Sequence, residues 1–320
     1  MNKIIKIIVA IIIVFLIVGL SVAFWALSQF SVPQTEAGTD RIVINLNTTQ
    51  AQLIPKLKDQ GYIKSEWAFG YVLNNKGWNN KIQPGAYQIS KSMDAWRLAD
   101  ILVNHPTEKW IVVPEGLRKE EIADLLDQKM NFAVGTKEDF LNSSKEGYLF
   151  PDTYLLNLNY AGSQIAQRMT NQFNEKAADI FKASTKANIR NDTLVILASL
   201  IQREAANEKE MPIIAGVIWN RLDQKMPLQI DASVQYALGK EGNWWPKIAT
   251  ADYKIDSPYN TYTNKGKPIA PICNPGLVAL NAVVNSQDSD YLYYIHDSQG
   301  QIHLAKTYQE QLDNIDKYLK

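Results

Sequence analysis

One acidic residue lies at the end of an apolar segment. Glu204 follows the run Leu194–Ile201, with only Gln202 and Arg203 between them. Because an apolar environment disfavours the charged form of a carboxyl group, such a residue tends to stay protonated. A protonated glutamate can give its proton to a leaving group and later take one back. The segment therefore predicts a general acid at Glu204.

The element that carries Glu204 decides whether it can reach a substrate. We expect a helix from Asp192 to Asn207. Glu204 falls at the edge of its apolar stripe, where the wall of a cleft would lie, whereas Arg203 points away. The stripe consists of Leu194, Leu197, Ala198, Ile201 and Ala205. An ordinary boundary glutamate in a salt bridge is the alternative, and on an average helix it is the commoner case.

Two segments further along the chain have the composition of a sugar-binding surface. Met226–Ser233 and Pro258–Thr263 are dense in amide, hydroxyl and aromatic side chains. Aromatic faces cover the C–H groups of sugar rings, and the polar groups bind hydroxyls and acetamides. Two loops that merely pack on each other would have the same composition. The candidate substrate-binding residues are Gln229, Asp231, Tyr259, Asn260, Thr261 and Tyr262.

A glycan hydrolase that uses water is an alternative for the same residues. Most glycosidases need a second carboxylate as base or nucleophile. Glu208, Asp231 and Asp256 are candidates for that role. A serine hydrolase lacks support, because there is no Gly-x-Ser-x-Gly motif and Ser199 falls within the buried helix pattern.

Metal and cofactor chemistry have little basis in the sequence. His105, His296, His303 and Cys273 are not at metal-ligand spacing, so we expect no metal. We expect His303 to be a surface residue of a strand pair. No glycine-rich loop is present to hold the phosphate of a pyridoxal cofactor, so we expect no cofactor.

The N-terminal segment predicts a membrane anchor. After Lys6 the chain is apolar for about 20 residues, enough to cross a bilayer as a helix. The run is too long for a cleaved signal peptide and continues through Phe24 and Trp25. Lys3 and Lys6 place the N-terminus in the cytoplasm. We therefore expect a single-pass protein of the cell membrane, with everything after Gln29 outside the cytoplasm.

Composition and local patterns divide the rest of the chain. The 33 basic and 33 acidic residues balance, which argues against nucleic acid as a partner. We expect a cytoplasmic tip and signal-anchor over residues 1–28, a linker over 29–40, a small module over 41–107 and a larger domain over 108–320. Strands and helices do not alternate regularly, so the predicted class is α+β.

The small module should contain short strands and helices. Strands are expected at Arg41–Leu46 and Pro84–Ile89, and helices after Thr48 or Thr49, after Ser65 and from Ser92. Helical spacing predicts that its aromatic residues are core, which favours a spacer over a carbohydrate-binding module. These aromatic residues are Trp67, Tyr71 and Trp96.

The larger domain should be mainly helical. Besides the helix of Glu204, helices are expected at Gln164–Phe181 and Pro212–Gln224. Glu146–Tyr154 is too rich in glycine, proline and aromatic residues for a regular element. Tyr291–Ile295 and Gln301–Leu304 predict a strand pair.

Several stretches, in the same order, resemble one known family. The segment Leu197–Glu204 resembles the catalytic helix of the membrane-anchored endolytic murein transglycosylases, the YceG-like family. The similarity covers nearly the whole chain. The other stretches that carry it are Glu146–Tyr154, Met226–Asp231, Pro258–Thr263, Asn274-Pro275-Gly276 and Tyr291-Leu292-Tyr293.

The resemblance implies a lytic transglycosylase acting on peptidoglycan strands. It implies cleavage of the β-1,4 bond between N-acetylmuramic acid and N-acetylglucosamine, leaving 1,6-anhydro-muramic ends and ending glycan elongation. It also implies a catalytic Glu204, a LysM-like module at 41–107, and peptidoglycan synthases or division proteins as candidate partners. A non-catalytic wall-binding scaffold is the alternative that would not need Glu204.

The chain departs from the family pattern at two places. The family has an acidic residue where Gln202 stands, so a charge is missing near the site. It often has a histidine after a glutamate near the C-terminus, where this chain has Gln311 after Glu310. A role for that histidine does not carry over.

Overall fold

The computed structural model describes residues 3–319. Residues 1–2, which belong to the expected cytoplasmic tip and signal-anchor, and residue 320 lie outside this range. The chain forms two compact units. The first contains the residues up to Trp110 together with Tyr154–Asn159, and the second contains Ile111–Thr153 and the chain from Tyr160 onward. Both helices and strands are present, which confirms the expected α+β class.

The first element is the apolar helix α1, Lys3–Ser28. It is long and apolar enough to cross a membrane, and it buries none of its residues within the protein. Exposed side chains along a whole helix are expected when lipid, rather than protein, covers them. The helix is therefore compatible with a single-pass membrane anchor.

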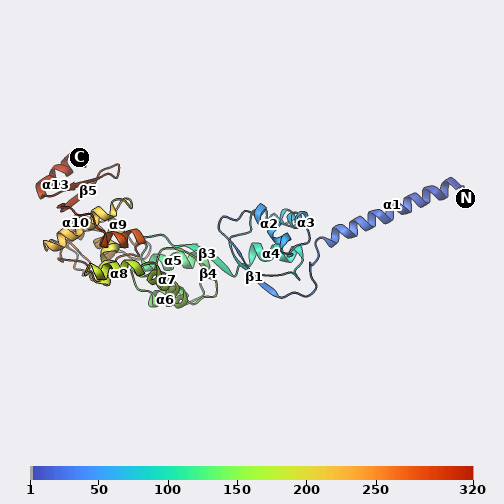
Figure 1. Ribbon diagram of the computed structural model, residues 1–320, viewed down its shortest axis with the longest axis horizontal. Coiled ribbons are helices and arrows are strands. Elements are labelled where there is room, and N and C mark those ends of the chain that lie inside the picture. Colours follow the sequence, from blue (N-terminus) through green and yellow to red (C-terminus); the bar gives the residue numbers. More distant parts are fainter. Residues whose placement is uncertain (1–2, 320) are drawn as a thin grey trace. The chain divides into compact units, whose positions relative to one another are not determined.

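A four-stranded sheet with the order β1-β2-β3-β4 organises the first unit (Figure 1). Strand β1, Thr39–Ile44, pairs antiparallel with β2, Gly85–Ser90, and β2 pairs antiparallel with β3, Glu108–Val112. The last strand, β4, Thr153–Asn157, returns from the following part of the chain. The stretch Glu146–Tyr154, expected to be irregular, therefore ends two residues earlier than predicted, because β4 begins at Thr153.

Three helices accompany the sheet of the first unit. They are α2, Gln50–Asp59; α3, Glu66–Asn75; and α4, Ala95–Asn104. Thr49 and Gln52 form a capping box at α2, and Ser65 is the N-cap of α3, as expected. The prediction that α4 opens at Ser92 is wrong, because Asp94 accepts the cap hydrogen bond from the Arg97 N–H at 2.7 Å.

The aromatic residues of this unit do not all belong to its core. Trp96 is partly buried, but Trp67 and Tyr71 are 50% and 52% exposed, so the prediction that they are core is wrong. The face of α3 that packs inward contains Phe69, Val72 and their neighbours. Trp67 and Tyr71 lie four residues apart on another face of the same helix.

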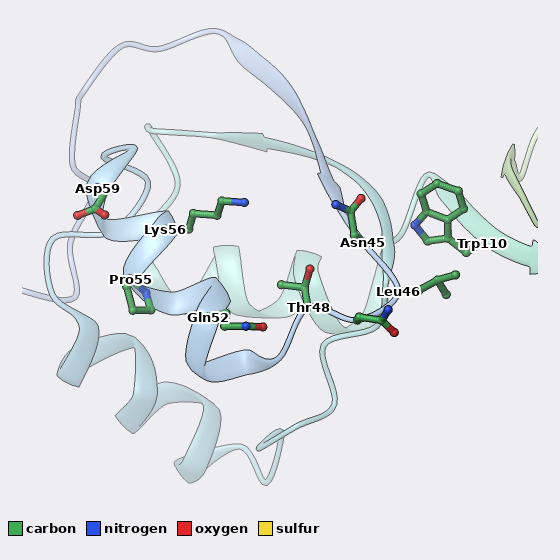
Figure 2. A pocket seen from close by; sticks show the side chains of 9 residues that line it. Asn45, Leu46, Thr48, Gln52, Pro55, Lys56, Asp59 and Trp110 are labelled. Atoms are coloured by element: carbon green, nitrogen blue, oxygen red, sulfur yellow. The ribbon is translucent and has the colours of Figure 1, made fainter.

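An open hollow of about 800 Å³ lies where β1 runs into α2 (Figure 2). Figure 2 shows Trp110 at one end of it and Asp59 at the other. The indole N–H of Trp110 donates to the Ile44 carbonyl at 3.1 Å, which fixes the ring beside the β1–α2 loop. Amide and hydroxyl side chains, including Asn45 and Gln52, form part of its lining.

The second unit begins with four helices. They are α5, Lys119–Met130; α6, Thr136–Ser143; α7, Gly162–Lys176; and α8, Ala178–Lys186. The single helix expected at Gln164–Phe181 is therefore two helices. The break at Ala177 escapes a periodicity argument because this residue keeps near-helical backbone angles and is buried.

The remaining elements surround a core of apolar side chains. They are α9, Asn191–Glu204; α10, Met211–Asp223; α11, Asp231–Leu238; the 3₁₀ helix η1, Thr250–Lys254; α12, Leu277–Val284; β5, Tyr293–His296; β6, Ile302–Ala305; and α13, Tyr308–Tyr318. The antiparallel pairing of β5 with β6 confirms the predicted strand pair. Helix α9 lies in this core, with eight consecutive buried residues from Leu194 to Ile201.

Helix α9 ends at Glu204, three residues before the predicted end at Asn207. Ala205 has extended backbone angles, φ −72° and ψ 131°. The two residues that follow Ala205 bind Glu210 instead of continuing the helix. The Glu210 carboxylate accepts from the Ala206 N–H at 3.1 Å and from the side-chain amide of Asn207 at 2.8 Å. Glu204 therefore sits on the last turn of a buried helix, where the chain leaves the core.

Candidate active site

The carboxyl group of Glu204 has a buried tyrosine as its partner. The Tyr294 hydroxyl, on β5, donates to Glu204 Oε2 at 2.7 Å. Burial raises the pKa of Glu204 above its ordinary value, whereas this hydrogen bond lowers it. The pKa of Tyr294 is itself raised by burial, so its hydroxyl stays protonated and remains a donor. Glu204 is thus a shielded acid whose anion has a donor in place.

The start of helix α11 also faces Glu204. The backbone N–H of Ala232 favours the Glu204 anion, while the charge of Asp231 raises the pKa of Glu204 further. The first N–H groups of a helix have no partner within it and lie at its positive end, so they suit a nearby anion. The same carboxyl can therefore release a proton and then persist as an anion.

Asp231 is linked to a second tyrosine. Tyr262 donates to Asp231 Oδ1 at 2.5 Å, and burial followed by this hydrogen bond raises the pKa of Tyr262. The side chain of Asp231 is exposed. Gln229, two residues earlier, is also exposed, has a left-handed backbone at φ 54° and binds the Thr261 carbonyl through its N–H. The structure thus brings Asp231 and Tyr262 together beside Glu204.

Two of the candidate binding residues are inside the protein. Asn260 and Thr261 are 0% and 1% exposed. The Asn260 amide donates to the carbonyls of Tyr253 and Ile255, and the Thr261 hydroxyl accepts from the Ile230 N–H. Thr261 therefore ties the two loops together, whereas Asn260 stabilises the loop to which it belongs. Direct contact of these two with a substrate stays a prediction.

Tyr259 lies in a different aromatic group. Its ring centroid is 4.7 Å from that of Tyr236 on α11. The Tyr236 ring is covered by the Arg118 guanidinium at 3.9 Å, and its hydroxyl donates to Glu146 at 3.3 Å. These contacts connect Tyr259, through Tyr236, to Glu146. They do not connect Tyr259 directly to the carboxyl of Glu204.

Glu146 is a second shielded carboxyl, and the sequence did not single it out. Burial raises its pKa to about 8. Glu146 accepts from the Lys119 N–H at the start of α5 and from the Asn274 amide at 2.8 Å. Asn274 also accepts from the Leu149 N–H at 2.9 Å. Glu146 thus joins three stretches that are far apart in the chain.

Arg221 is a positioning residue that sequence reasoning missed. This buried residue of α10 donates to the carbonyls of Leu228 at 2.7 Å and Leu292 at 2.6 Å, and to Gln229 Oε1 at 3.3 Å. One guanidinium therefore connects the loop before Asp231 with the strand that carries Tyr294. This arginine in the last turn of α10 gave no signal in the sequence, because its main partners are backbone carbonyls.

Glu210 and His296 make a similar connection at the other end of β5. The imidazole of His296 lies 2.9 Å from Glu210 Oε2. The same oxygen accepts the hydrogen bond from the Ala206 N–H in the turn after Glu204. The strand of Tyr294 is thus attached to the loop that follows the acid. Gln311 adds a hydrogen bond from its amide to the Tyr294 carbonyl at 3.2 Å.

The remaining candidates take other positions. Gln202 accepts from the Gly276 N–H at 2.9 Å and donates to Glu115, whose pKa burial raises. Glu208, a candidate for the second carboxylate, is exposed in the turn that follows the end of α9. Asp256 is also exposed.

Ser199 and His303 have protein partners. Ser199 is fully buried, as predicted, and its hydroxyl accepts from the Ile272 N–H at 3.0 Å. His303 on β6 lies 2.9 Å from Asp297 and stacks on Tyr318 at 3.5 Å, so it is more covered than a surface residue. Among residues 3–319, no three His, Cys, Asp or Glu side chains are grouped in a way that could hold a metal ion.

The fold and the site define an α+β protein in which the carboxyl group of Glu204 faces a buried tyrosine and the N-terminus of a helix. Comparison with known sequences agrees. Residues 42–317 match the YceG-like family, and the chain belongs to that family. The resemblance found in the sequence is confirmed.

Two curated relatives and one solved structure illustrate the relationship. The Bacillus subtilis protein named endolytic murein transglycosylase is 33% identical, over 82% of this chain and 80% of its own length. The Streptococcus pneumoniae D39 protein of the same name is 26% identical, over 82% of this chain but 55% of its own length. A yceG-like protein from Listeria monocytogenes has 25% identity and a TM-score of 0.58, over 86% of this chain and 98% of that chain.

Proposed function

We propose that this chain is an endolytic lytic transglycosylase that cleaves peptidoglycan strands, with Glu204 as its catalytic acid and base. The observation that supports this most directly is the environment of the Glu204 carboxyl group. It is a shielded carboxyl with a raised pKa, a tyrosine donor at 2.7 Å and a helix N–H at hand. The names of the relatives supply the substrate class.

The first chemical step needs an acid. Glu204, whose pKa is raised by burial, gives its proton to the glycosidic oxygen that leaves with N-acetylglucosamine. The bond from C1 of N-acetylmuramic acid to that oxygen breaks, and positive charge develops at C1. The acetamide carbonyl of the sugar stabilises this centre. Tyr294 and the Ala232 N–H stabilise the carboxylate that remains on Glu204.

The second step needs a base. The C6 hydroxyl of the same muramic residue attacks C1, and its proton passes to the Glu204 carboxylate. The product carries a 1,6-anhydro ring, no water is consumed, and Glu204 is protonated again. Because the sugar supplies the nucleophile, one carboxyl suffices. Asp231, tied to Tyr262 at 2.5 Å, then orients the substrate and does not attack it.

The two loops around Glu204 are the proposed glycan-binding surface. Exposed Gln229 and Asp231 and the partly buried rings of Tyr259 and Tyr262 are the groups proposed to contact the sugars. The interior residues Asn260 and Thr261 would then act through the shape of the loops, which their hydrogen bonds maintain.

We further propose the organisation implied by the family. The helix α1 anchors the chain once in the cell membrane with its N-terminus in the cytoplasm, residues 29–40 follow it, residues 41–107 form a LysM-like module, and residues 108–320 form the catalytic domain outside the cytoplasm. Peptidoglycan synthases and division proteins are candidate partners. The apolar surface of α1, none of whose residues is buried within the protein, supports the anchor.

Analysis of the reaction products tests this proposal. The full chain in detergent is incubated with purified peptidoglycan, and the fragments are weighed before and after borohydride treatment. New muramic ends should be one water lighter than hydrolysis products and should resist reduction. Fragments with reducing ends would instead make the chain a hydrolase. The absence of any cleavage, with glycan still bound, would favour the scaffold alternative.

A further inference from the structure

The first unit presents an aromatic patch that the catalytic proposal does not use. The patch consists of Phe30, Trp67, Tyr71 and Trp96. Trp67 and Tyr71 are 50% and 52% exposed, although large aromatic side chains normally bury much of their surface. The ring of Phe30 lies 5.5 Å from Trp67, 5.8 Å from Tyr71 and 6.2 Å from Trp96 between centroids.

Phe30 fixes the patch to the end of the anchor helix. Its carbonyl accepts from the Ala95 N–H at the start of α4, at 3.0 Å. The next residue, Ser31, accepts from the Lys64 ammonium at 2.8 Å, and the Gln34 N–H donates to the Lys91 carbonyl at 3.1 Å. The segment expected to be a linker is therefore bound to the unit from its first residues and leaves little slack after α1.

This attachment limits how far the patch can lie from a membrane. The apolar run ends at Leu27, and the Phe30 N–H donates to the Leu27 carbonyl, so the chain is still coiled there. At about 1.5 Å per residue, Phe30 lies roughly 5 Å beyond the end of the apolar run. The headgroup layer on each side of a bilayer is about 5–8 Å thick. Trp67 and Tyr71, whose ring centroids lie 5.5 and 5.8 Å from that of Phe30, are therefore close enough to reach that layer.

We propose that Trp67 and Tyr71 insert into the lipid headgroup layer and seat the first unit on the membrane surface. Tryptophan and tyrosine are the residues that favour this layer, because one end of each is apolar and the other is polar. Lys64 lies beside the patch, and the Lys76 ammonium lies 5.8 Å from the Trp96 ring, so both can meet lipid phosphates. Glu66, the neighbour of Trp67, is acidic and repels anionic lipid, so we expect only a modest preference for anionic lipid.

A lipid surface is favoured over a protein partner because the patch continues the exposed apolar surface of α1. Leu27 and Trp25 at the end of α1 are 70% and 58% exposed. A protein that covered the patch would have to share this position with lipid. This inference rests on the proposed membrane anchor. The following experiment tests the anchor and the insertion of the patch separately.

The full chain is reconstituted into nanodiscs that contain a phosphatidylcholine with a diazirine near its glycerol group. After illumination and trypsin digestion, labelled peptides are identified by mass spectrometry. Cleavage after Lys64 and Lys76 releases the patch helix as Ser65–Lys76. The matched control is Thr307–Lys317 from α13, whose Tyr308 is 63% exposed. The peptide of α1 reports on the anchor itself.

Labelling of α1 and of Ser65–Lys76, each well above Thr307–Lys317, is the expected result. The double substitution Trp67→Ser with Tyr71→Ser should lower labelling of the patch peptide several-fold while α1 stays labelled, with an unchanged unfolding temperature as evidence of folding. Labelling of α1 with the patch at the control level would overturn the seating and leave the anchor standing. Absence of label from α1 as well would overturn both.

Discussion

Removal of one hydroxyl group should shift the pH dependence of the enzyme. The Tyr294 hydroxyl donates to Glu204 Oε2 at 2.7 Å and therefore stabilises the anionic form of the carboxyl. Burial raises the pKa of Glu204, and Tyr294 opposes that rise. Tyr294→Phe keeps the ring and removes the donor, so the pKa of Glu204 should increase.

The size of the shift follows from the hydrogen bond. A hydrogen bond to a charged group contributes about 1.5–3 kcal/mol, and one pKa unit corresponds to about 1.4 kcal/mol. The pKa should therefore rise by about 1–2 units. Glu204 must be protonated for the first step, so kcat/KM falls as pH rises through its pKa. In Tyr294→Phe this alkaline fall should move about 1–2 units higher.

The assay is kcat/KM against pH, measured with the full chain on peptidoglycan by counting anhydro ends. Tyr293→Phe is the matched control, because its ring lies beside Tyr308 and Arg221 on the neighbouring position of β5. Its profile should match that of the wild type. An alkaline limb that stays in place or moves to lower pH in Tyr294→Phe would refute the assignment of Glu204 as the acid held by Tyr294.

Four further predictions test the site and the domain organisation. Glu204→Gln should lower activity by about 10²- to 10⁴-fold or more while folding persists, and Glu208→Gln should stay near wild type; the reverse outcome would move the acid to Glu208. Arg221→Lys keeps the charge but loses the forked donors to two carbonyls, so urea unfolding should show a loss of about 2–4 kcal/mol; an unchanged midpoint would contradict the role given to Arg221. Glu146 has a pKa of about 8 when folded and an ordinary one near 4.5 when unfolded, so folding takes up a proton and stability falls as pH rises between these values. Glu146→Gln should therefore remove part of the fall in unfolding temperature between pH 5 and pH 8, and equal falls in both proteins would argue against a neutral buried Glu146. Replacement of residues 1–29 by a cleavable signal peptide should leave cleavage of soluble glycan intact and weaken function in cells; a released chain that is inactive on soluble glycan would show that the anchor belongs to the active form.

The sequence alone determined the features that depend on neighbours a few residues apart. The apolar run of α1, the buried stripe of α9 and the β5–β6 pair follow from hydropathy and spacing. Glu204 stood out because an acid at the edge of such a stripe is costly to bury as an anion. The family resemblance came from several short stretches in order, and the match of residues 42–317 confirms the family itself.

Local patterns failed where backbone geometry at a single residue decides an element's end. Helix α9 stops at Glu204 because Ala205 is extended, and the helix predicted through Ala177 divides there. Apolar periodicity runs across both positions, since it reports which face is buried and not where the backbone turns. Trp67 and Tyr71 fit a helical pattern as well, yet helical spacing does not say which face the rest of the protein covers.

Only the tertiary structure decided what surrounds the acid. Tyr294 is 90 residues from Glu204 in the chain, and Arg221 reaches carbonyls of two separate segments. Backbone carbonyls carry no sequence signature, and long-range pairing of strands and loops has no local period. An acid at the end of an apolar helix is thus visible in the sequence, whereas the groups that surround the Glu204 carboxyl come together only when the chain folds.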